Sequence, residues 1–382
     1  MSFLLDGVMA VTWQQIVMYV VGIVLIWVGV KKEYEPSLLL PMGFGAILVN
    51  LPFSGVIDQV VQGKVEAAGI IQWLFESGIE ASEAMPILLF IGIGAMIDFG
   101  PLLSQPVLFL FGAAAQFGIF AAIVIACLMG FDLKDAASIG IIGAADGPTS
   151  ILVSQVLDSN YMGPIAVAAY SYMALVPIIQ PFAIKLVTTH KERSIHMEYN
   201  PKSVNKALRI SFPIAVTIIV GFISPQSVAL VGFLMFGNLL RECGVLNSLS
   251  QAAQNELANI ITLLLGITIS FSMRAEQFVN GATIMIMALG LVAFVFDTIG
   301  GVIFAKIVNV FLKMAGKKPV NPMIGGCGIS AFPMSSRVVQ KLAAQEEPGN
   351  IILMQAAGTN VSGQVASVIA GGLVISVVTQ YL

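Results

Sequence analysis

Charged side chains are scarce in this sequence. Of 382 residues, 57% are hydrophobic and 10% are Asp, Glu, Lys or Arg, whereas about a quarter of the residues in a soluble domain are charged. So few charges exclude a water-facing globular surface. The 18 Lys and Arg form no run interleaved with aromatic residues, so nothing indicates nucleic-acid binding. We expect lipid to surround most of the chain.

Several chemical motifs are also missing. Three cysteines and two histidines, without paired or metal-ligand spacing, give no basis for a disulfide framework or a transition-metal site. The sequence contains no P-loop, no nucleophile triad and no dinucleotide fingerprint.

Long apolar runs are abundant, and about 20 apolar residues suffice for a helix to cross a bilayer. We therefore predict an all-α polytopic membrane protein. The first run has no basic segment before it and no small-residue cleavage site, so we interpret it as a retained span. The expected spans lie near residues 11–30, 36–57, 107–131, 159–184, 210–240, 257–273, 277–296 and 348–382.

The basic residues predict the orientation. Because cytoplasmic loops are enriched in Lys and Arg, the N-terminus is expected outside. This requires segments 134–160 and 320–346 to enter and leave on the same side, as re-entrant helical hairpins. The residues expected at the cytoplasmic face are Lys31, Lys32, Lys185, Lys191, Arg193, Lys202, Lys206, Arg209, Arg241, Lys313, Lys317 and Lys318.

Both segments are poor spanning helices, because each places glycines, a proline and hydroxyls in an apolar setting. Aligning Pro148 with Pro333 also pairs the preceding spans roughly in order. We predict two inverted-topology repeats, residues 1–190 and 207–382, joined by a cytoplasmic loop over 191–206, with the hairpins meeting near the midplane. Residues 64–83 fit an amphipathic helix at the outer interface.

Asp146 is the residue most able to carry chemistry. It lies beside Gly147 and Pro148 in the first hairpin, where an unpaired carboxylate costs roughly 2.5–3.5 kcal/mol and no Lys or Arg is near in sequence. Na⁺ would supply the charge, and a proton would replace it when the site empties. A helix-capping carboxylate is the alternative. The other oxygen ligands available are Thr149, Asn321, Ser330 and Asn360. Taken alone, Thr149 and Ser330 are more simply hydroxyls that bond back to their own helix, so the prediction depends on the whole set.

Other polar residues carry two interpretations each. Tyr172 is a candidate site residue or a packing tyrosine. Arg337 is a flanking cytoplasmic charge or a group that grips an incoming carboxylate. Asp297 is a second intramembrane acid or a polar packing contact.

Two motifs together resemble a known family. Residues 143–151 read Gly-Ala-Ala-Asp-Gly-Pro-Thr-Ser-Ile, and residues 358–364 read Gly-Thr-Asn-Val-Ser-Gly-Gln. With 321–337 between them, the chain resembles the membrane β subunit of the biotin-dependent, sodium-pumping decarboxylases that act on oxaloacetate, glutaconyl-CoA, methylmalonyl-CoA or malonate.

The resemblance implies a subunit that decarboxylates carboxybiotin, exports Na⁺ and consumes an external proton. It implies Asp146 as the central Na⁺ and proton site with Tyr172 beside it, and Arg337 as the group that holds the carboxyl of carboxybiotin. The second hairpin and the last helix would contribute Asn321, Gly325, Ser330, Asn360 and Ser367.

The resemblance also implies partners: a carboxyltransferase α subunit, a biotin-carrier subunit, a small membrane-anchor subunit and two further copies of this chain in a homotrimer. The location implied is the bacterial inner membrane. No Met-Lys-Met attachment site is present, so biotin must arrive on another subunit. The alternative is a Na⁺-coupled carrier or Na⁺/H⁺ exchanger without decarboxylase chemistry. The soluble partner selects the acyl substrate, and the compact chain favours an acyl-CoA such as glutaconyl-CoA.

Overall fold

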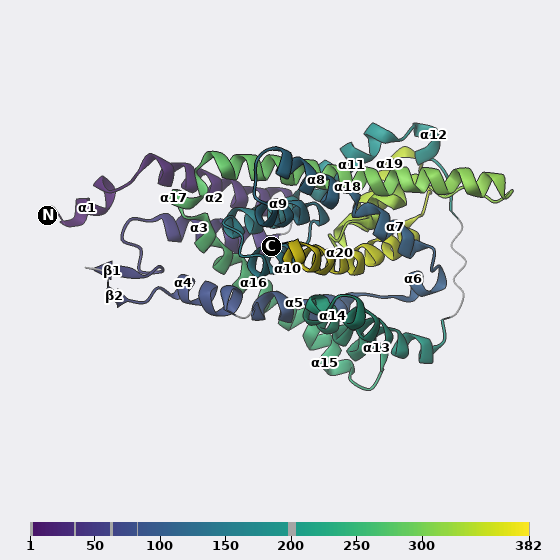
Figure 1. Ribbon diagram of the computed structural model, residues 1–382, viewed down its shortest axis with the longest axis horizontal. Coiled ribbons are helices and arrows are strands. Elements are labelled where there is room, and N and C mark those ends of the chain that lie inside the picture. The colour runs from purple at the N-terminus through teal and green to yellow at the C-terminus, as the bar shows by residue number, and fades with distance from the viewer. Residues whose placement is uncertain (1–2, 34–35, 62–63, 82, 198–203, 382) are drawn as a thin grey trace.

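The computed structural model describes residues 3–33, 36–61, 64–81, 83–197 and 204–381. The chain is mostly helical, and six described helices are long and apolar enough to cross a membrane, or up to eight if two bent pairs each count as one span. Figure 1 shows most long helices running along one axis, with β1 and β2 near one end and α12 and α19 near the other. The prediction of an all-α polytopic membrane protein is confirmed at this level.

The elements of the first half end at the loop after α12. They are α1 (Phe3–Met9), α2 (Trp13–Lys32), α3 (Pro36–Asn50), β1 (Gln59–Val61), β2 (Lys64–Ala67), α4 (Ile70–Phe75), η1 (Glu76–Glu80), α5 (Ala84–Met96), α6 (Gly100–Ser104), α7 (Leu108–Ala115), α8 (Phe117–Leu128), α9 (Leu133–Gly140), η2 (Ile141–Ala144), α10 (Gly147–Val156), α11 (Met162–Val187) and α12 (His190–Arg193).

The second half begins at Lys206. Its elements are α13 (Lys206–Ile223), η3 (Pro225–Ser227), α14 (Val228–Glu242), α15 (Asn247–Ala252), η4 (Ala253–Leu257), α16 (Ala258–Ile269), η5 (Ser270–Met273), α17 (Ala275–Phe278), α18 (Gly281–Met314), η6 (Pro322–Gly328), α19 (Met334–Glu346) and α20 (Leu353–Tyr381).

Three expected segments are corrected. The run 210–240 is two antiparallel helices, because Pro225 and Ser224 break it; Gly221 then faces Val228 across the turn. The run 36–57 is helical only to Asn50, and the run 277–296 continues to Met314 as α18.

The amphipathic helix expected over 64–83 is wrong in its first part. Residues Lys64–Ala67 form strand β2, which pairs antiparallel with Gln59–Val61, and helix α4 starts only at Ile70. Valines at both strands favour extended backbone. Gly69 then turns the chain where a Cβ would lie 2.2 Å from the backbone of Ile57.

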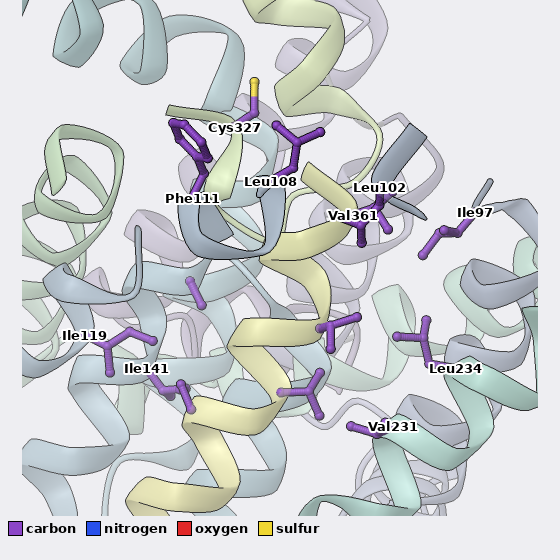
Figure 2. Close-up of a cluster of buried hydrophobic side chains, with 14 of the residues drawn as sticks. Ile97, Leu102, Leu108, Phe111, Ile119, Ile141, Val231, Leu234, Cys327 and Val361 are labelled. Atoms are coloured by element: carbon purple, nitrogen blue, oxygen red, sulfur yellow. The ribbon is translucent and has the colours of Figure 1, made fainter. Parts of the chain in front are cut away.

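The C-terminal helix α20 lies at the centre of the molecule. Of its most apolar window, 72% is buried, against 17% for α2 and 11% for α13. Figure 2 shows apolar side chains of neighbouring helices, Leu108 and Phe111 among them, packed beside Val361 of α20. The exposed apolar faces of α2 and α13 are those that lipid or another chain must cover.

The first hairpin, α9–η2–α10, returns to the place where it starts. The Asp135 carboxylate at its beginning accepts hydrogen bonds from Ser159 Oγ (2.8 Å) and from the backbone N–H (3.0 Å) and Nδ2 (3.2 Å) of Asn160 at its end. The two ends of the segment are therefore adjacent, as a re-entrant hairpin requires.

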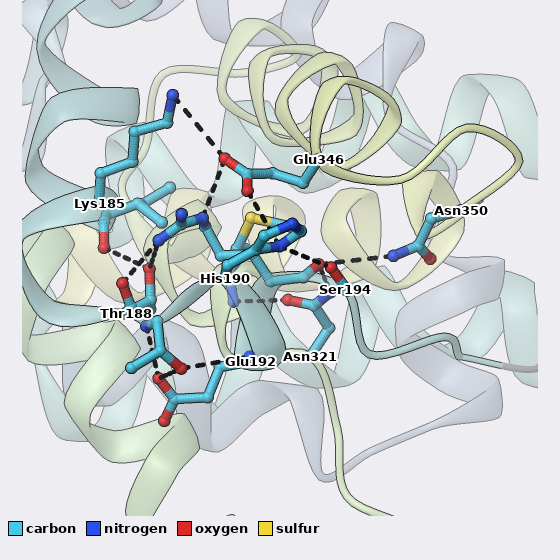
Figure 3. Close-up of polar contacts among 12 residues, drawn as sticks. Lys185, Thr188, His190, Glu192, Ser194, Asn321, Glu346 and Asn350 are labelled. Carbon is cyan, nitrogen blue, oxygen red and sulfur yellow. Dashed lines mark hydrogen bonds and ion pairs between the residues drawn. The ribbon is translucent and has the colours of Figure 1, made fainter.

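The second hairpin, η6–α19, is closed in a similar way. Asn321 before η6 donates through Nδ2 to the carbonyls of Arg193 (2.7 Å) and Ile195 (2.9 Å), and Asn350 after α19 donates to the same two carbonyls. Figure 3 shows both asparagines converging on this loop. The expected end at residue 346 lies four residues short of Asn350.

Ion pairs fix the same loop to the second hairpin and to α18. Glu346 at the end of α19 pairs with Arg193 (3.0 Å) and Lys185 (3.8 Å), and Lys306 of α18 pairs with Glu192 (3.0 Å). Partial burial opposes the charged form of Glu192, but hydrogen bonds from Thr189 and Lys306 lower its pKa. The basic loop expected in the cytoplasm thus anchors the base of the second hairpin.

Candidate functional site

Asp146 lies in the break of the first hairpin. The η2 turn ends at Ala144, Ala145 takes a left-handed conformation with φ of 52°, and α10 begins at Gly147 with Pro148 in its first turn. Proline is favoured there because the first N–H groups of a helix have no intrahelical acceptor. Asp146 caps α10 by accepting the N–H of Thr149 at 3.4 Å. The capping alternative is therefore correct, but it describes only part of the site.

The Asp146 carboxylate also joins three segments. Its Oδ2 accepts hydrogen bonds from Ser330 Oγ (2.9 Å), Ser367 Oγ (3.0 Å) and Gln364 Nε2 (3.2 Å). The residue is 4% exposed, and no Lys or Arg forms an ion pair with it in the described part of the chain. A buried carboxylate is thus held by hydroxyl and amide groups, without a permanent cationic neighbour.

The tips of the two hairpins meet at this point. Besides the Ser330 side chain, its backbone N–H donates to the carbonyl of Ala144 at 2.9 Å. Ser330 follows η6, whose carbonyls are released by the break, and Ala144 precedes the break of the first hairpin. The predicted meeting of two broken segments is therefore observed in atomic contacts.

The last helix presents one polar face to the site. Asn360, Gln364 and Ser367 are spaced by four and three residues on α20, so they lie on the same side of the helix. Asn360 donates through Nδ2 to the carbonyl of Ile329 at 2.8 Å, directly before Ser330. The face of α20 thus contacts both Asp146 and the second hairpin.

Side-chain amides satisfy the carbonyls in the break of the second hairpin. Gln180 Nε2 donates to Gly326 (2.9 Å), and Gln116 Nε2 donates to Gly328 (3.2 Å). Irregular backbone at bilayer depth requires such internal partners. The amide groups of Gln116 and Gln180 come from the α7–α8 junction and from α11, so several helices fix the shape of this hairpin.

A cavity of about 250 Å³ reaches the carboxylate. Hairpin residues form one wall, among them Asp146, Ser330 and Phe332. The facing helices add apolar side chains together with Gln254, Asn259 and Thr262. Asp146 is therefore open to a compartment that contains both polar and apolar surface.

Tyr170 explains the glycine after Asp146. Its ring occupies the place where a Cβ on Gly147 would lie, only 2.2 Å from ring carbon Cζ. Tyr170 also lines the cavity, is 1% exposed, and has a hydroxyl without a hydrogen-bond partner within the described residues. Gly147 thus allows a buried phenol to pack against the Asp146 turn.

The structure does not bring every predicted residue to Asp146. The Tyr172 hydroxyl donates to the carbonyl of Met287 on α18. Asn321 lies at the base of the hairpin, where its Oδ1 accepts the N–H of Met323 at 3.1 Å. Arg337 is exposed on the first turn of α19. Gly325 is a packing position, where a Cβ would lie 2.1 Å from the carbonyl oxygen of Gly301.

The sequence interpretation also missed residues. Gln364 donates directly to Asp146 but was not predicted. The sequence did offer a signal, because Gln364 stands in the motif 358–364 and its spacing from Asn360 and Ser367 places all three on one helix face. No signal of this kind singles out Tyr170, because Tyr172 lies two residues later in the same apolar segment and the sequence does not distinguish the two tyrosines. Thr149 was predicted as an oxygen ligand of the cation, whereas its contact with Asp146 is made by its backbone N–H.

Comparison with known proteins agrees with the geometry. Residues 14–378 match the family described as the Na⁺-transporting oxaloacetate decarboxylase beta subunit. The chain belongs to this family. The match covers nearly the whole sequence, so the predicted family is confirmed, and a carrier without decarboxylase chemistry is not favoured.

Relatives cover almost the full length of both chains. The methylmalonyl-CoA decarboxylase subunit beta of Propionigenium modestum is 45% identical over 378 residues, 94% of each chain. The glutaconyl-CoA decarboxylase subunit beta of Acidaminococcus fermentans is 44% identical over 373 residues, 98% of this chain and 96% of the relative. The probable oxaloacetate decarboxylase beta chain of Vibrio cholerae is 40% identical over 425 aligned positions, 97% of each.

These relatives are bacterial, and the helices of this chain are apolar enough to span a bilayer. The chain is a multi-pass protein of the bacterial inner membrane, as predicted. No group of three or more His, Cys, Asp or Glu that could hold a metal occurs in the described ranges.

Proposed function

We propose that this chain is the membrane subunit that decarboxylates carboxybiotin and couples the reaction to Na⁺ export, with consumption of an external proton. The observation that carries the proposal is the Asp146 carboxylate, buried between two broken hairpins and bound by Ser330, Gln364 and Ser367. The family membership supplies the decarboxylase and the link to Na⁺.

The groups around Asp146 suit a cation that comes and goes. Ser330 and Ser367 carry hydroxyl oxygens, which donate to a carboxylate when no cation is present and become ligands when the hydroxyl rotates. Gln364 can turn its amide to present oxygen in place of nitrogen. Three oxygens and a carboxylate form a set that a hard cation prefers. A proton on Asp146 would replace Na⁺ and leave the site neutral.

Carboxybiotin would enter the cavity beside Asp146. The C–N bond between the carboxylate and the ureido nitrogen breaks, CO₂ leaves, and a proton replaces it on nitrogen. The cavity walls offer apolar surface for the rings and the amides Gln254 and Asn259 for the ureido group. Phe332 lines the cavity, and Arg337 follows five residues later at the start of α19, where it would hold the carboxylate. Transfer from water to such a cavity favours loss of CO₂.

The two hairpins would approach from opposite faces of the membrane. The base of the second hairpin is fixed to the basic loop around Arg193, which the positive-inside rule assigns to the cytoplasm. The base of the first hairpin, at Asp135 and Asn160, borders a separate polar cavity of about 440 Å³ with Arg274 and Gln277. This supports inverted repeats over 1–190 and 207–382, with access to Asp146 alternating between two sides.

The proposal includes the partners predicted from the resemblance. Biotin would arrive on a carrier subunit, a carboxyltransferase α subunit would load it, and a small anchor subunit would hold the assembly. A homotrimer would cover part of the exposed apolar surface of helices such as α2 and α13. The proposed reaction uses Na⁺ and biotin, the latter carried on another subunit.

The substrate of the whole complex would be an acyl-CoA. Relatives from acyl-CoA decarboxylases align over 373 and 378 positions, which fits this 382-residue chain closely. The alignment with the oxaloacetate relative covers 425 positions. Because this chain has only 382 residues, the alignment contains long gaps. The compact chain therefore agrees with the methylmalonyl-CoA or glutaconyl-CoA type.

The test is Na⁺-dependent turnover of carboxybiotin by the assembled complex in proteoliposomes. The wild-type complex should release CO₂ and take up ²²Na⁺ together, and Asp146→Asn should abolish both because the amide has no charge to offer a cation. Coupled activity in Asp146→Asn would refute the proposal. Flux of Na⁺ by this chain alone, without partners or carboxybiotin, would indicate a plain carrier.

A further inference from the structure

A second cavity, of about 470 Å³, lies between α13, the α7–α8 pair and α20. It is separate from the cavity that reaches Asp146. Its α20 wall includes Val365 and Ile369, which lie on the face of the helix opposite Gln364 and Ser367. The helix that brings two hydrogen-bond donors to Asp146 therefore has this cavity at its back.

Two contacts join α13 to the rest of the molecule, one on either side of the cavity. Near the start of α13, the Phe212 ring packs on Phe109 of α7, with the ring centroids 6.3 Å apart. Beyond its end, Ser227 Oγ donates to the carbonyl of Val368 on α20 at 3.1 Å. Between these positions α13 borders the cavity, with Ile219 among the lining residues. The cavity is thus the space that α13 spans between two fixed points.

The cavity opens toward the bilayer. Leu110, Phe120 and Ile219 line it and are 54%, 49% and 55% exposed, on helices that are long and apolar enough to cross a membrane. We call these three residues the rim. The inner wall is buried, since Val365 and Ala370 are 4% and 5% exposed. Only 11% of the apolar window of α13 is buried, so lipid hydrocarbon lies beside the rim.

The lining of the cavity is almost entirely apolar. Its two polar side chains in the described chain both donate to backbone carbonyls, Ser362 to Phe109 at 3.1 Å and Gln116 to Gly328 at 3.2 Å. Gln116 Oε1 has no partner within the described residues. A buried water needs about two to four polar partners, whereas apolar cavities stay dry and bind apolar molecules. The lining therefore favours hydrocarbon over water.

The shape of the cavity limits what can enter. It follows α20 from Ser362 to Leu373, a length of about 17 Å at 1.5 Å per residue, so its volume corresponds to a passage about 6 Å across. A helix with its side chains is about 10–12 Å across. An extended hydrocarbon chain fits this passage, and a helix of another subunit does not.

We propose that one acyl chain of a membrane lipid binds in this cavity and supports α20 from behind. The chain enters past Ile219 and lies along Val365 and Ile369. It also contacts Gln116, which holds Gly328 in the break of the second hairpin. The bound chain thereby holds α20 and the second hairpin in place relative to α13. Its effect on Na⁺ binding rests on the proposed function, whereas binding of the chain itself does not.

The test is photolabelling of the complex in proteoliposomes by a phosphatidylglycerol whose acyl chain carries a diazirine. The wild-type complex should be labelled at Val365 or Ala370, which lipid on the outer surface does not reach, as well as at the exposed Ile23 of α2. Ile219→Trp fills the rim and should lower the inner label at least about tenfold, because close-packed side chains leave no room for a chain. Phe222→Trp is the matched control, since Phe222 is exposed on the same helix and does not line the cavity.

Three results of the photolabelling would overturn the proposal. The first is wild-type label at Ile23 with none at Val365 or Ala370. The second is equal inner label in Ile219→Trp and Phe222→Trp. The third is an unlabelled inner wall together with a smaller assembly of Ile219→Trp in detergent, which would show that a second copy of this chain covers the rim.

Equilibrium binding of ²²Na⁺ tests the support of α20. Removal of lipid by detergent exchange should lower the Na⁺ affinity of the wild-type complex about fivefold, at the low end of ordinary coupling between sites, and added phosphatidylglycerol should restore it. Ile219→Trp supplies its own ring and should depend less on lipid than Phe222→Trp. Equal wild-type affinity with and without lipid would overturn the support of α20. Inner label without any Na⁺ binding would contradict the proposed function and leave the acyl-chain site intact.

Discussion

The Ser330 hydroxyl donates to Oδ2 of Asp146 across 2.9 Å, although the two residues are 184 positions apart in the chain. Each lies in the break of a hairpin whose ends are closed at a different place, at Asp135 for the first and at the Arg193 loop for the second. A single hydrogen bond therefore reports whether the two hairpins are together. Any movement of one hairpin against the other must break this contact or carry the partner along.

Removing the Ser330 hydroxyl should weaken Na⁺ binding without unfolding the chain. Hydrogen bonds and ligands to charged groups contribute about 1.5 kcal/mol, so Ser330→Ala should raise the Na⁺ concentration for half-maximal turnover roughly tenfold. Ser336→Ala is the control, because Ser336 is equally buried in the same hairpin and donates to Pro333, not to Asp146. Similar Na⁺ dependence of the two variants would exclude Ser330 from the ion site.

Gly147 should tolerate no side chain while Tyr170 is present. In Gly147→Ala the new methyl overlaps the Tyr170 ring, and overpacking of this kind costs about 1–3 kcal/mol. The expected result is a lower midpoint of thermal unfolding for the purified complex. Replacing the ring in the double variant Gly147→Ala/Tyr170→Leu should restore part of the loss, and no recovery would show that backbone conformation, not the ring, requires glycine.

Gly325 and Gly301 should behave as a close-contact pair. A Cβ on either residue would lie 2.1 Å from the carbonyl oxygen of the other, so Gly325→Ala must separate η6 from α18. We expect a loss of about 1–3 kcal/mol of stability, seen as reduced yield and earlier thermal unfolding. Gly281→Ala is the control, because nothing lies within 4 Å of a Cβ there. Stability equal to wild type in Gly325→Ala would contradict the packing role.

Arg337 should act on carboxybiotin and not on Na⁺. Arg337→Ala removes a cation from the exposed first turn of α19, so decarboxylation should slow by about tenfold or more through the loss of a charge-assisted contact, while equilibrium Na⁺ binding stays close to wild type. Lys341→Ala, one turn later on the same helix and also exposed, is the control. Parallel loss of Na⁺ binding in Arg337→Ala would place this residue in the ion site.

Sequence patterns predicted the class of molecule and the positions of the helix breaks in the two hairpins. Low charge and long apolar runs indicate a polytopic helical protein, because lipid accepts no other surface, and glycine with proline in apolar segments marks the positions near Asp146 and Ser330. The same patterns failed where local sequence carries no long-range information. The run 210–240 reads as one span and is two helices, and residues 64–67 form a strand that pairs with 59–61.

The identity of the acid and its need for oxygen ligands came from the amino-acid sequence alone, since a charge in an apolar segment is visible without coordinates. Which oxygens reach that acid was decided by the tertiary structure. Gln364 touches Asp146 while Tyr172 bonds to Met287 and Asn321 lies at the base of its hairpin. Contacts between segments hundreds of residues apart depend on how helices cross and where glycines let them approach, and composition and spacing do not contain that geometry.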